Sequence, residues 1–251
     1  MGTRFWGTVF LALFCPAVSN ASNLSTLFGH NLTPTSYLLE EGQVTVGAYA
    51  IGYGITKRWT LATSPWMILS YNMPMVASKF LIAEGDTTRL SLETSFFKTF
   101  DYYIPLPYPH GQYDQESFFT RLVGTKRWGQ YALHVCYGWQ YFLREGRPFS
   151  LRLDPGSADP STHSLSVLNE INITPYVGLF FEGGILGLNY AGPYLHLGAS
   201  LFVQSSWGMV QAGLSASMRT NNNAVFWDRD LDVDVFHERH IHPEIQLQSY
   251  F

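Results

Sequence analysis

The chain has 251 residues, enough for one domain of ordinary size, and no shift in composition divides it into two. Only 14% of its residues are charged, against roughly 25% in a typical soluble protein, whereas 16% are aromatic. The formal net charge of −4 leaves no basic surface for a phosphate backbone, so nucleic acid is excluded as an expected partner.

The N-terminus has the pattern of a secretory signal peptide. Arg4 gives it a positive start, residues 5–14 are apolar, and small residues suitable for cleavage include Ser19 and Ala21. About ten apolar residues are too few to cross a ~30 Å hydrocarbon layer as a helix. We therefore expect residues 1–21 to be removed on export and residues 22–251 to form a single domain.

The two cysteines of the chain predict neither a lipid anchor nor a disulfide. Cys15 follows the bulky Phe14, which argues against a lipid-modified N-terminus. Removal of the signal would leave Cys136 alone, so no intrachain disulfide is expected.

Beyond the signal, the chain alternates apolar and polar residues in segments of about ten. In residues 130–144, Val135, Tyr137 and Trp139 share one face, while His134 and Gln140 share the other. No run of about 18 apolar residues is present, and a closed barrel is the other architecture that satisfies every backbone group in lipid. The expected strands are residues 44–54, 61–71, 75–83, 88–100, 118–127, 130–144, 165–173, 176–186, 194–204, 208–218 and 240–251.

The links between these strands alternate between short and mostly long, as in outer-membrane barrels with short periplasmic turns. Eleven strands conflict with the even number of bacterial single-chain barrels, so parity predicts a twelfth strand in residues 23–39 and places both mature ends in the periplasm. The predicted fold is all-β: a transmembrane antiparallel up-and-down β-barrel of about 12 strands, with 10 as the alternative. A soluble β-sandwich is the competing class.

The last strand carries a second localisation signal. Ile241, Ile245, Leu247 and the terminal Phe251 alternate with polar residues, whereas Ser249 interrupts the apolar row. This pattern resembles the C-terminal β-signal of Gram-negative outer-membrane barrels. The resemblance implies an outer-membrane location, with membrane lipid and the barrel-insertion machinery as partners and Ile245, Leu247 and Phe251 as signal residues.

If the apolar faces meet lipid, a set of polar residues should line the lumen. These candidates are Lys79, Arg89, Glu93, Arg121, His134, Glu170, Glu182 and His196. Glu93 should pair with Lys79 and Arg121 on neighbouring strands. Such residues either fill a narrow interior or line a path for small solutes, and the sequence leaves both open.

Other groupings point to specific binding less clearly. Aromatic residues near strand ends fit girdles at the membrane boundary, with carbohydrate stacking as the alternative: Trp59, Trp66, Tyr71, Trp128, Tyr131, Trp139, Tyr141 and Trp207. Two groups near the C-terminus contain residue types that bind metals, but their spacing matches neither an EF-hand nor a zinc site. They are an acidic row (Asp228, Asp230, Asp232, Asp234) and a nearby group (His237, His240, His242, Glu238, Glu244). Neither a metal nor another cofactor is expected.

The sequence favours a porin-like or otherwise non-enzymatic barrel, with passage of small solutes through the polar lumen as one role. A lipid hydrolase or acyltransferase is the alternative: His134, His196, Ser200 and Ser215 supply suitable residue types, although no G-x-S-x-G motif is present. A third hypothesis is a surface interaction barrel with a sealed lumen, using the Pro- and Tyr-rich residues 102–113.

Overall fold

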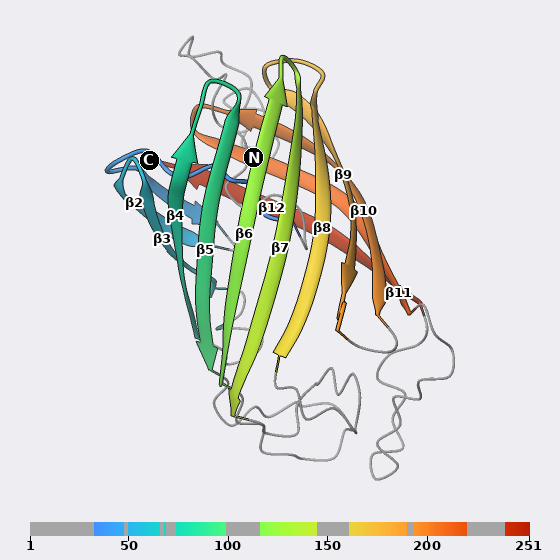
Figure 1. Cartoon of the computed structure of the whole chain (residues 1–251). Coiled ribbons are helices and arrows are strands. Elements are labelled where there is room, and N and C mark those ends of the chain that lie inside the picture. The colour runs from blue at the N-terminus through green and yellow to red at the C-terminus, as the bar shows by residue number, and fades with distance from the viewer. Residues whose placement is uncertain are drawn as a thin grey trace, which may run out of the picture.

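The computed structural model describes residues 33–47, 50–65, 68, 74–98, 116–144, 161–189, 193–219 and 239–251. Twelve strands in this part of the chain form one closed antiparallel barrel (Figure 1). The strands are β1 (Val44–Gly47), β2 (Ile51–Thr56), β3 (Trp59–Thr63), β4 (Met75–Glu84), β5 (Thr88–Lys98), β6 (Glu116–Trp128), β7 (Tyr131–Arg144), β8 (Ser161–Asn172), β9 (Val177–Leu186), β10 (Tyr194–Ser205), β11 (Gly208–Arg219) and β12 (Arg239–Tyr250).

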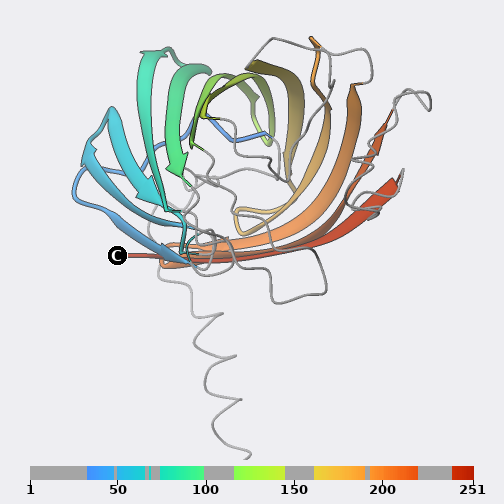
Figure 2. The same ribbon diagram turned by 90° about the horizontal axis from the view of Figure 1, so that it is seen from below.

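Each strand pairs with its neighbours in sequence, and β1 pairs with β12 to close the ring. Viewed from below, the strands surround a central space (Figure 2). At the closing seam, the Val44 N–H donates to the Phe251 carbonyl at 2.9 Å, and the Phe251 N–H donates to the Val44 carbonyl at 2.8 Å. Closure removes the unpaired sheet edge that would otherwise leave backbone groups without partners.

The alternating sequence gives the barrel two chemically different faces. Large apolar side chains such as Val76 (61% exposed) and Leu214 (59%) are on the outside. Polar side chains, among them Ser91, His134 and Gln211, are fully buried on the inside. This polarity is the reverse of a soluble domain, whose apolar face is the buried one.

The two ends of the barrel differ in their connections. Tight turns join β2 to β3, β4 to β5, β6 to β7, β8 to β9 and β10 to β11, at one end that we call the tight-turn end. The C-terminus lies at this end (Figure 1), where the Tyr250 N–H donates to the Trp207 carbonyl at 2.8 Å. At the β6–β7 turn, Gly129 adopts a φ of 58°, which favours glycine. We call the opposite end, with the longer links, the loop end.

Twelve strands are present, but the twelfth is not where parity placed it. Residues 33–39 form no strand, so that part of the expectation is wrong; residues 23–32 lie outside the described residues. Instead, residues 44–54 make two strands, and the Gly47 N–H donates to the Ala50 carbonyl at 2.8 Å in the turn between them. A Cβ on Gly47 would lie 2.1 Å from Gln248 Oε1. Glycine therefore allows β1 to approach β12 closely.

The expected strand over residues 61–71 is also too long. β3 ends at Thr63, and the Ile68 N–H donates to the Ser64 carbonyl at 3.2 Å. Pro65 has no N–H to donate to a ladder, which explains why pairing stops there. The signal peptide of residues 1–21 lies outside the described residues, and no helix within them is long and apolar enough to span a membrane.

Candidate functional site

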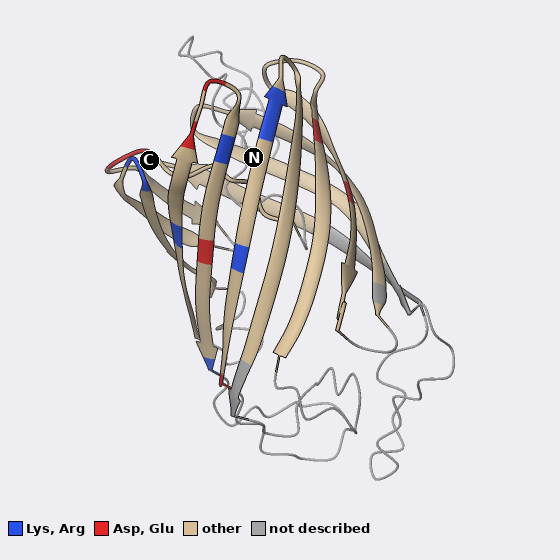
Figure 3. Ribbon diagram, in the orientation of Figure 1, with Lys and Arg blue, Asp and Glu red and all other residues tan. Residues whose placement is uncertain are grey.

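The candidate site is the interior of the barrel, the lumen, where charged side chains pair across strands. Glu93 on β5 lies between Lys79 on β4 and Arg121 on β6 in the strand register. Lys79 Nζ is 3.4 Å from Glu93 Oε2, and Arg121 donates to Glu93 Oε1. Figure 3 shows the corresponding red band on β5 between blue bands on β4 and β6. The expected pairing of one carboxylate with two cations is present.

Residues 33–39, which we call the lumen segment, cross this interior. Thr33, Thr35 and Ser36 are 0% exposed, although the segment has no strand partner. Lys79 Nζ donates to the Thr35 carbonyl at 2.8 Å, and the Leu39 N–H donates to Thr60 Oγ1 on β3 at 3.1 Å. The wall side chains thus satisfy backbone groups that a sheet ladder would otherwise satisfy.

Tyr37 anchors the middle of the lumen segment. The guanidinium carbons of Arg89 and Arg127 lie 5.6 and 5.5 Å from its ring centre, within cation–π range. Arg127 Nη2 also donates to the Tyr37 hydroxyl at 3.0 Å. The His134 ring meets the Tyr37 ring edge to face at 5.5 Å. One tyrosine therefore contacts three consecutive strands of the wall.

A row of hydrogen bonds continues from the lumen segment into the wall. Ser36 Oγ donates to Thr125 Oγ1 at 2.6 Å, and Thr125 Oγ1 is 2.7 Å from His134 Nδ1. On the other side of the ring, His134 Nε2 is 3.2 Å from Glu170 Oε2. Arg127 Nη2 lies 3.1 Å from Glu170 Oε1, so the buried carboxylate has a cation as well as the imidazole beside it.

A second histidine–glutamate pair holds the start of the lumen segment. His196 Nε2 on β10 lies 3.0 Å from Glu182 Oε2 on β9. The other carboxylate oxygen of Glu182 accepts a hydrogen bond from the Thr33 N–H. Contacts from β3 to β9 thus tie the segment to opposite sides of the ring.

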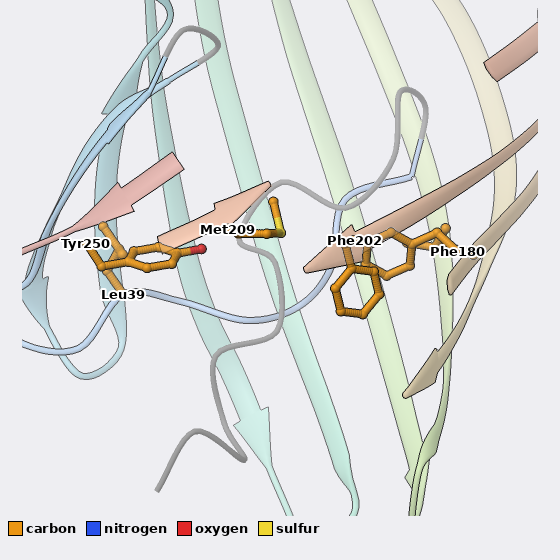
Figure 4. Close-up of a cluster of buried hydrophobic side chains, with 6 residues drawn as sticks. Leu39, Phe180, Phe202, Met209 and Tyr250 are labelled. Atoms are coloured by element: carbon orange, nitrogen blue, oxygen red, sulfur yellow. The ribbon is translucent and has the colours of Figure 1, made fainter. Parts of the chain in front are cut away.

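An apolar cluster lies inside the barrel near the tight-turn end, on the side of β8 to β12. Phe180 and Phe202 stack with ring centres 4.5 Å apart, and Leu39 of the lumen segment lies near Tyr250 in the same cluster (Figure 4). A Cβ on Gly178 would lie 2.2 Å from Phe202 Cζ, so glycine makes room for that ring. The full cluster is Leu39, Leu168, Phe180, Phe202, Met209 and Tyr250. The cluster thus joins side chains of the wall with one residue of the lumen segment, Leu39.

All eight lumen-lining candidates occupy inward positions, and each has a charged or aromatic partner there: Lys79, Arg89, Glu93, Arg121, His134, Glu170, Glu182 and His196. That these residues line a path for solutes stays a prediction. The predicted set lacked Arg127. This residue lies two positions from Thr125 on the same inward face of β6, so period-two spacing could have identified it. Tyr37 and Ser36 gave no such signal, since their stretch was expected to be a strand.

The serines and histidines considered for catalysis, His134, His196, Ser200 and Ser215, are all buried on the inward face of the wall. His134 contacts Glu170, His196 contacts Glu182, and Ser200 Oγ accepts from Gln211 Nε2 at 3.0 Å. Ser215 is buried on the inward face of β11.

Several other expectations fall outside the described residues: the acidic row from Asp228 to Asp234, His237, the loop of residues 102–113, and the aromatic residues Trp66 and Tyr71. The side chains of His240, His242 and Glu244 are likewise not described. Within the described part of the chain, no group of three or more His, Cys, Asp or Glu residues is arranged to hold a metal ion.

No protein-family model matches the sequence, and the comparison with curated proteins finds no match. Among solved structures, OmpT, an outer membrane protein of Vibrio cholerae, is similar at a TM-score of 0.43 and 11% identity, over 93% of this chain and 74% of that one. OccAB2 of Acinetobacter baumannii gives a TM-score of 0.42 and 10% identity, over 85% and 56%. OccD1 (OprD) gives 0.41 and 10%, over 90% and 71%. At this identity, no residue role is carried over to this chain.

Proposed function

We propose that this chain is an integral outer-membrane β-barrel of a Gram-negative cell envelope, and that its lumen passes small solutes when the lumen segment moves aside. The observation that carries the proposal is the inverted polarity of the wall. Val76, Leu214 and Ile245 are each about 60% exposed on the outside, while the lumen holds charged pairs. Such an exterior is stable against hydrocarbon but not against water.

The spacing of aromatic residues on the outer wall supports membrane insertion. Trp128 and Tyr131 stack near the tight-turn end, and Trp139 and Tyr141 contact each other nearer the loop end. At about 3.3 Å per residue and a tilt of about 40°, the strand from Tyr131 to Tyr141 rises roughly 25 Å along the barrel axis. This equals the height of the apolar band in outer-membrane barrels, whose two borders carry aromatic girdles.

The lumen segment determines how much can pass. Its side chains and backbone bind the wall through Thr60, Lys79, Thr125, Arg127 and Glu182. Each hydrogen bond is individually modest, at about 1 kcal/mol for neutral groups and up to about 3 kcal/mol with a charged partner. We therefore expect the segment to occupy the lumen most of the time and conduction through the barrel to be low.

Membrane insertion is tested with the purified full chain refolded into lipid vesicles. We expect the folded form to migrate faster than the heated form in gel electrophoresis, and the strands to resist protease when the vesicles are intact. A chain that stays soluble and monomeric without detergent or lipid would contradict the proposed location.

Conduction is tested by locking the lumen segment. Ser36 Oγ and Thr125 Oγ1 are 2.6 Å apart, so Ser36→Cys with Thr125→Cys should form a disulfide without large movement. Cys136, the free cysteine among the described residues, is replaced by serine in all variants. In planar bilayers, we expect small conductance steps from the reduced form and fewer or none after oxidation. Absence of conductance in both forms, at any voltage, would remove the solute path.

A further inference from the structure

A serine, a histidine and a tyrosine meet on the outer wall of the barrel, away from the lumen. Ser161 and His163 lie two residues apart on β8, and they share its outward face with Leu165. Ser161 Oγ is 3.4 Å from His163 Nε2, and the Tyr137 hydroxyl on β7 is 2.5 Å from His163 Nδ1. We call these three residues the outer Ser–His cluster. Both nitrogens of one imidazole therefore have hydroxyl partners.

The backbone that carries Ser161 and His163 is held by the link after β9. Asn189 Oδ1 accepts from the His163 N–H at 3.0 Å, and Asn189 Nδ2 donates to the Ser161 carbonyl at 2.9 Å. The Gly187 N–H donates to the His163 carbonyl at 2.8 Å, and its φ of 74° favours glycine. These contacts hold the backbone from which both side chains extend, and a nucleophile and its base require such a fixed support.

The cluster lies at the height of the aromatic residues near the loop end. In the strand register, His163 is opposite Trp139 and Ser161 is opposite Tyr141. The boundary between lipid headgroups and acyl chains lies at such aromatic rows, and lipid ester carbonyls lie at this boundary. Tyr137 is 45% exposed and His163 is partly exposed, whereas Ser161 is only 7% exposed and is shielded from bulk water.

We propose that the outer Ser–His cluster hydrolyses the acyl esters of membrane lipids that reach it laterally from the bilayer. With the imidazole proton on Nδ1 donated to the Tyr137 hydroxyl, His163 Nε2 is free to accept the Ser161 proton. Tyr137 is then a positioning residue, Ser161 the nucleophile and His163 the base, in the arrangement that activates a serine hydroxyl.

The reaction proceeds in two balanced steps. Ser161 Oγ bonds to the ester carbonyl carbon as His163 takes its proton, and the carbon–oxygen bond to the lipid alcohol breaks as His163 returns that proton to the leaving oxygen. Water then attacks the acyl-serine and gives a proton to His163, which passes it to Ser161 Oγ as the fatty acid leaves. No oxidant, metal or further reactant is required.

The proposal rests on the proposed membrane location for its substrate, but the test separates the two. The purified full chain, refolded in detergent, is assayed with a short-chain nitrophenyl ester, a fluorogenic phospholipid and a fluorophosphonate probe located by mass spectrometry. We expect both substrates to be cleaved and the probe to label Ser161. Ser161→Ala and His163→Ala should each lose turnover by roughly a hundredfold or more.

Two further variants distinguish catalysis from structural support. Tyr137→Phe should lower kcat and shift its pH profile with little change in KM, because the imidazole loses its Nδ1 partner. Ser164→Ala, on the inward face of the same strand, should leave turnover unchanged. Folding of every variant is checked by heat-modifiable gel mobility.

The outcomes that overturn the proposal are specific. A correctly folded wild type that cleaves neither substrate, or a Ser161→Ala variant that keeps full turnover, would overturn the catalytic pair and leave the membrane location intact. Cleavage of the soluble ester without cleavage of phospholipid would overturn lipid as the substrate class.

Discussion

Glu93→Gln tests whether charge pairing in the lumen stabilises the barrel. The substitution keeps the shape of the side chain but leaves Lys79 and Arg121 without their shared carboxylate; the side chains of Lys79 and Glu93 are only 6% and 12% exposed. At 3.4 Å and an effective dielectric constant of about 20, the Lys79–Glu93 attraction alone is about 5 kcal/mol before desolvation. Removal of one partner from a buried pair typically costs about 3 to 5 kcal/mol.

We expect the Glu93→Gln cost to fall near the lower value, about 3 kcal/mol, because Lys79 keeps its hydrogen bond to the Thr35 carbonyl. The assay is urea unfolding of the barrel in lipid vesicles, followed by tryptophan fluorescence. Glu84→Gln is the matched control, since Glu84 pairs with Arg89 across the same two strands but both side chains are more than a third exposed. That variant should lose less than about 1 kcal/mol. Equal losses in the two variants would refute the reasoning.

Three further changes have defined outcomes. Gly178→Ala should destabilise the barrel by about 1 to 3 kcal/mol in the same unfolding assay, because the added methyl would overlap the Phe202 ring; an unchanged midpoint would contradict this packing. Tyr37→Ala should raise single-channel conductance, because the lumen segment loses its contacts with Arg127 and its neighbours, and unaltered traces would argue against an anchoring role. Phe251→Ala should slow barrel assembly into membranes in cells without lowering expression, whereas a normal assembly rate would remove Phe251 from the insertion signal.

The local pattern of the sequence was sufficient for most strands. β7 and β11 have apolar residues at every second position for most of their lengths, and such period-two alternation is typical of a barrel strand. The same alternation identified the lumen candidates. Whether a residue points inward depends on its position along its own strand, so the neighbouring strands need not be known. The pairing of Glu93 with Lys79 and Arg121 followed once strand order was assumed.

The strand count was right for a reason the sequence did not show. Alternation runs through Gly47 and Ala50 without a proline or an Asn-Gly turn signal, so the reversal between β1 and β2 could not be seen. The turn depends on how closely Gly47 approaches Gln248, about 200 residues later in the chain. Pro65 is a visible signal for the early end of β3, because a proline has no N–H for the strand ladder.

The sequence by itself therefore determined the class of this protein: a single barrel whose exposed face is apolar and whose inner face is polar. Only the tertiary structure decided what occupies that barrel and what lies on its wall. The lumen segment is held by side chains that lie 21 to 149 residues away in the sequence. Tyr137 on β7 contacts His163 on the neighbouring strand β8, 26 residues later in the chain. Such contacts depend on strand register and chain closure, which local residue patterns do not encode.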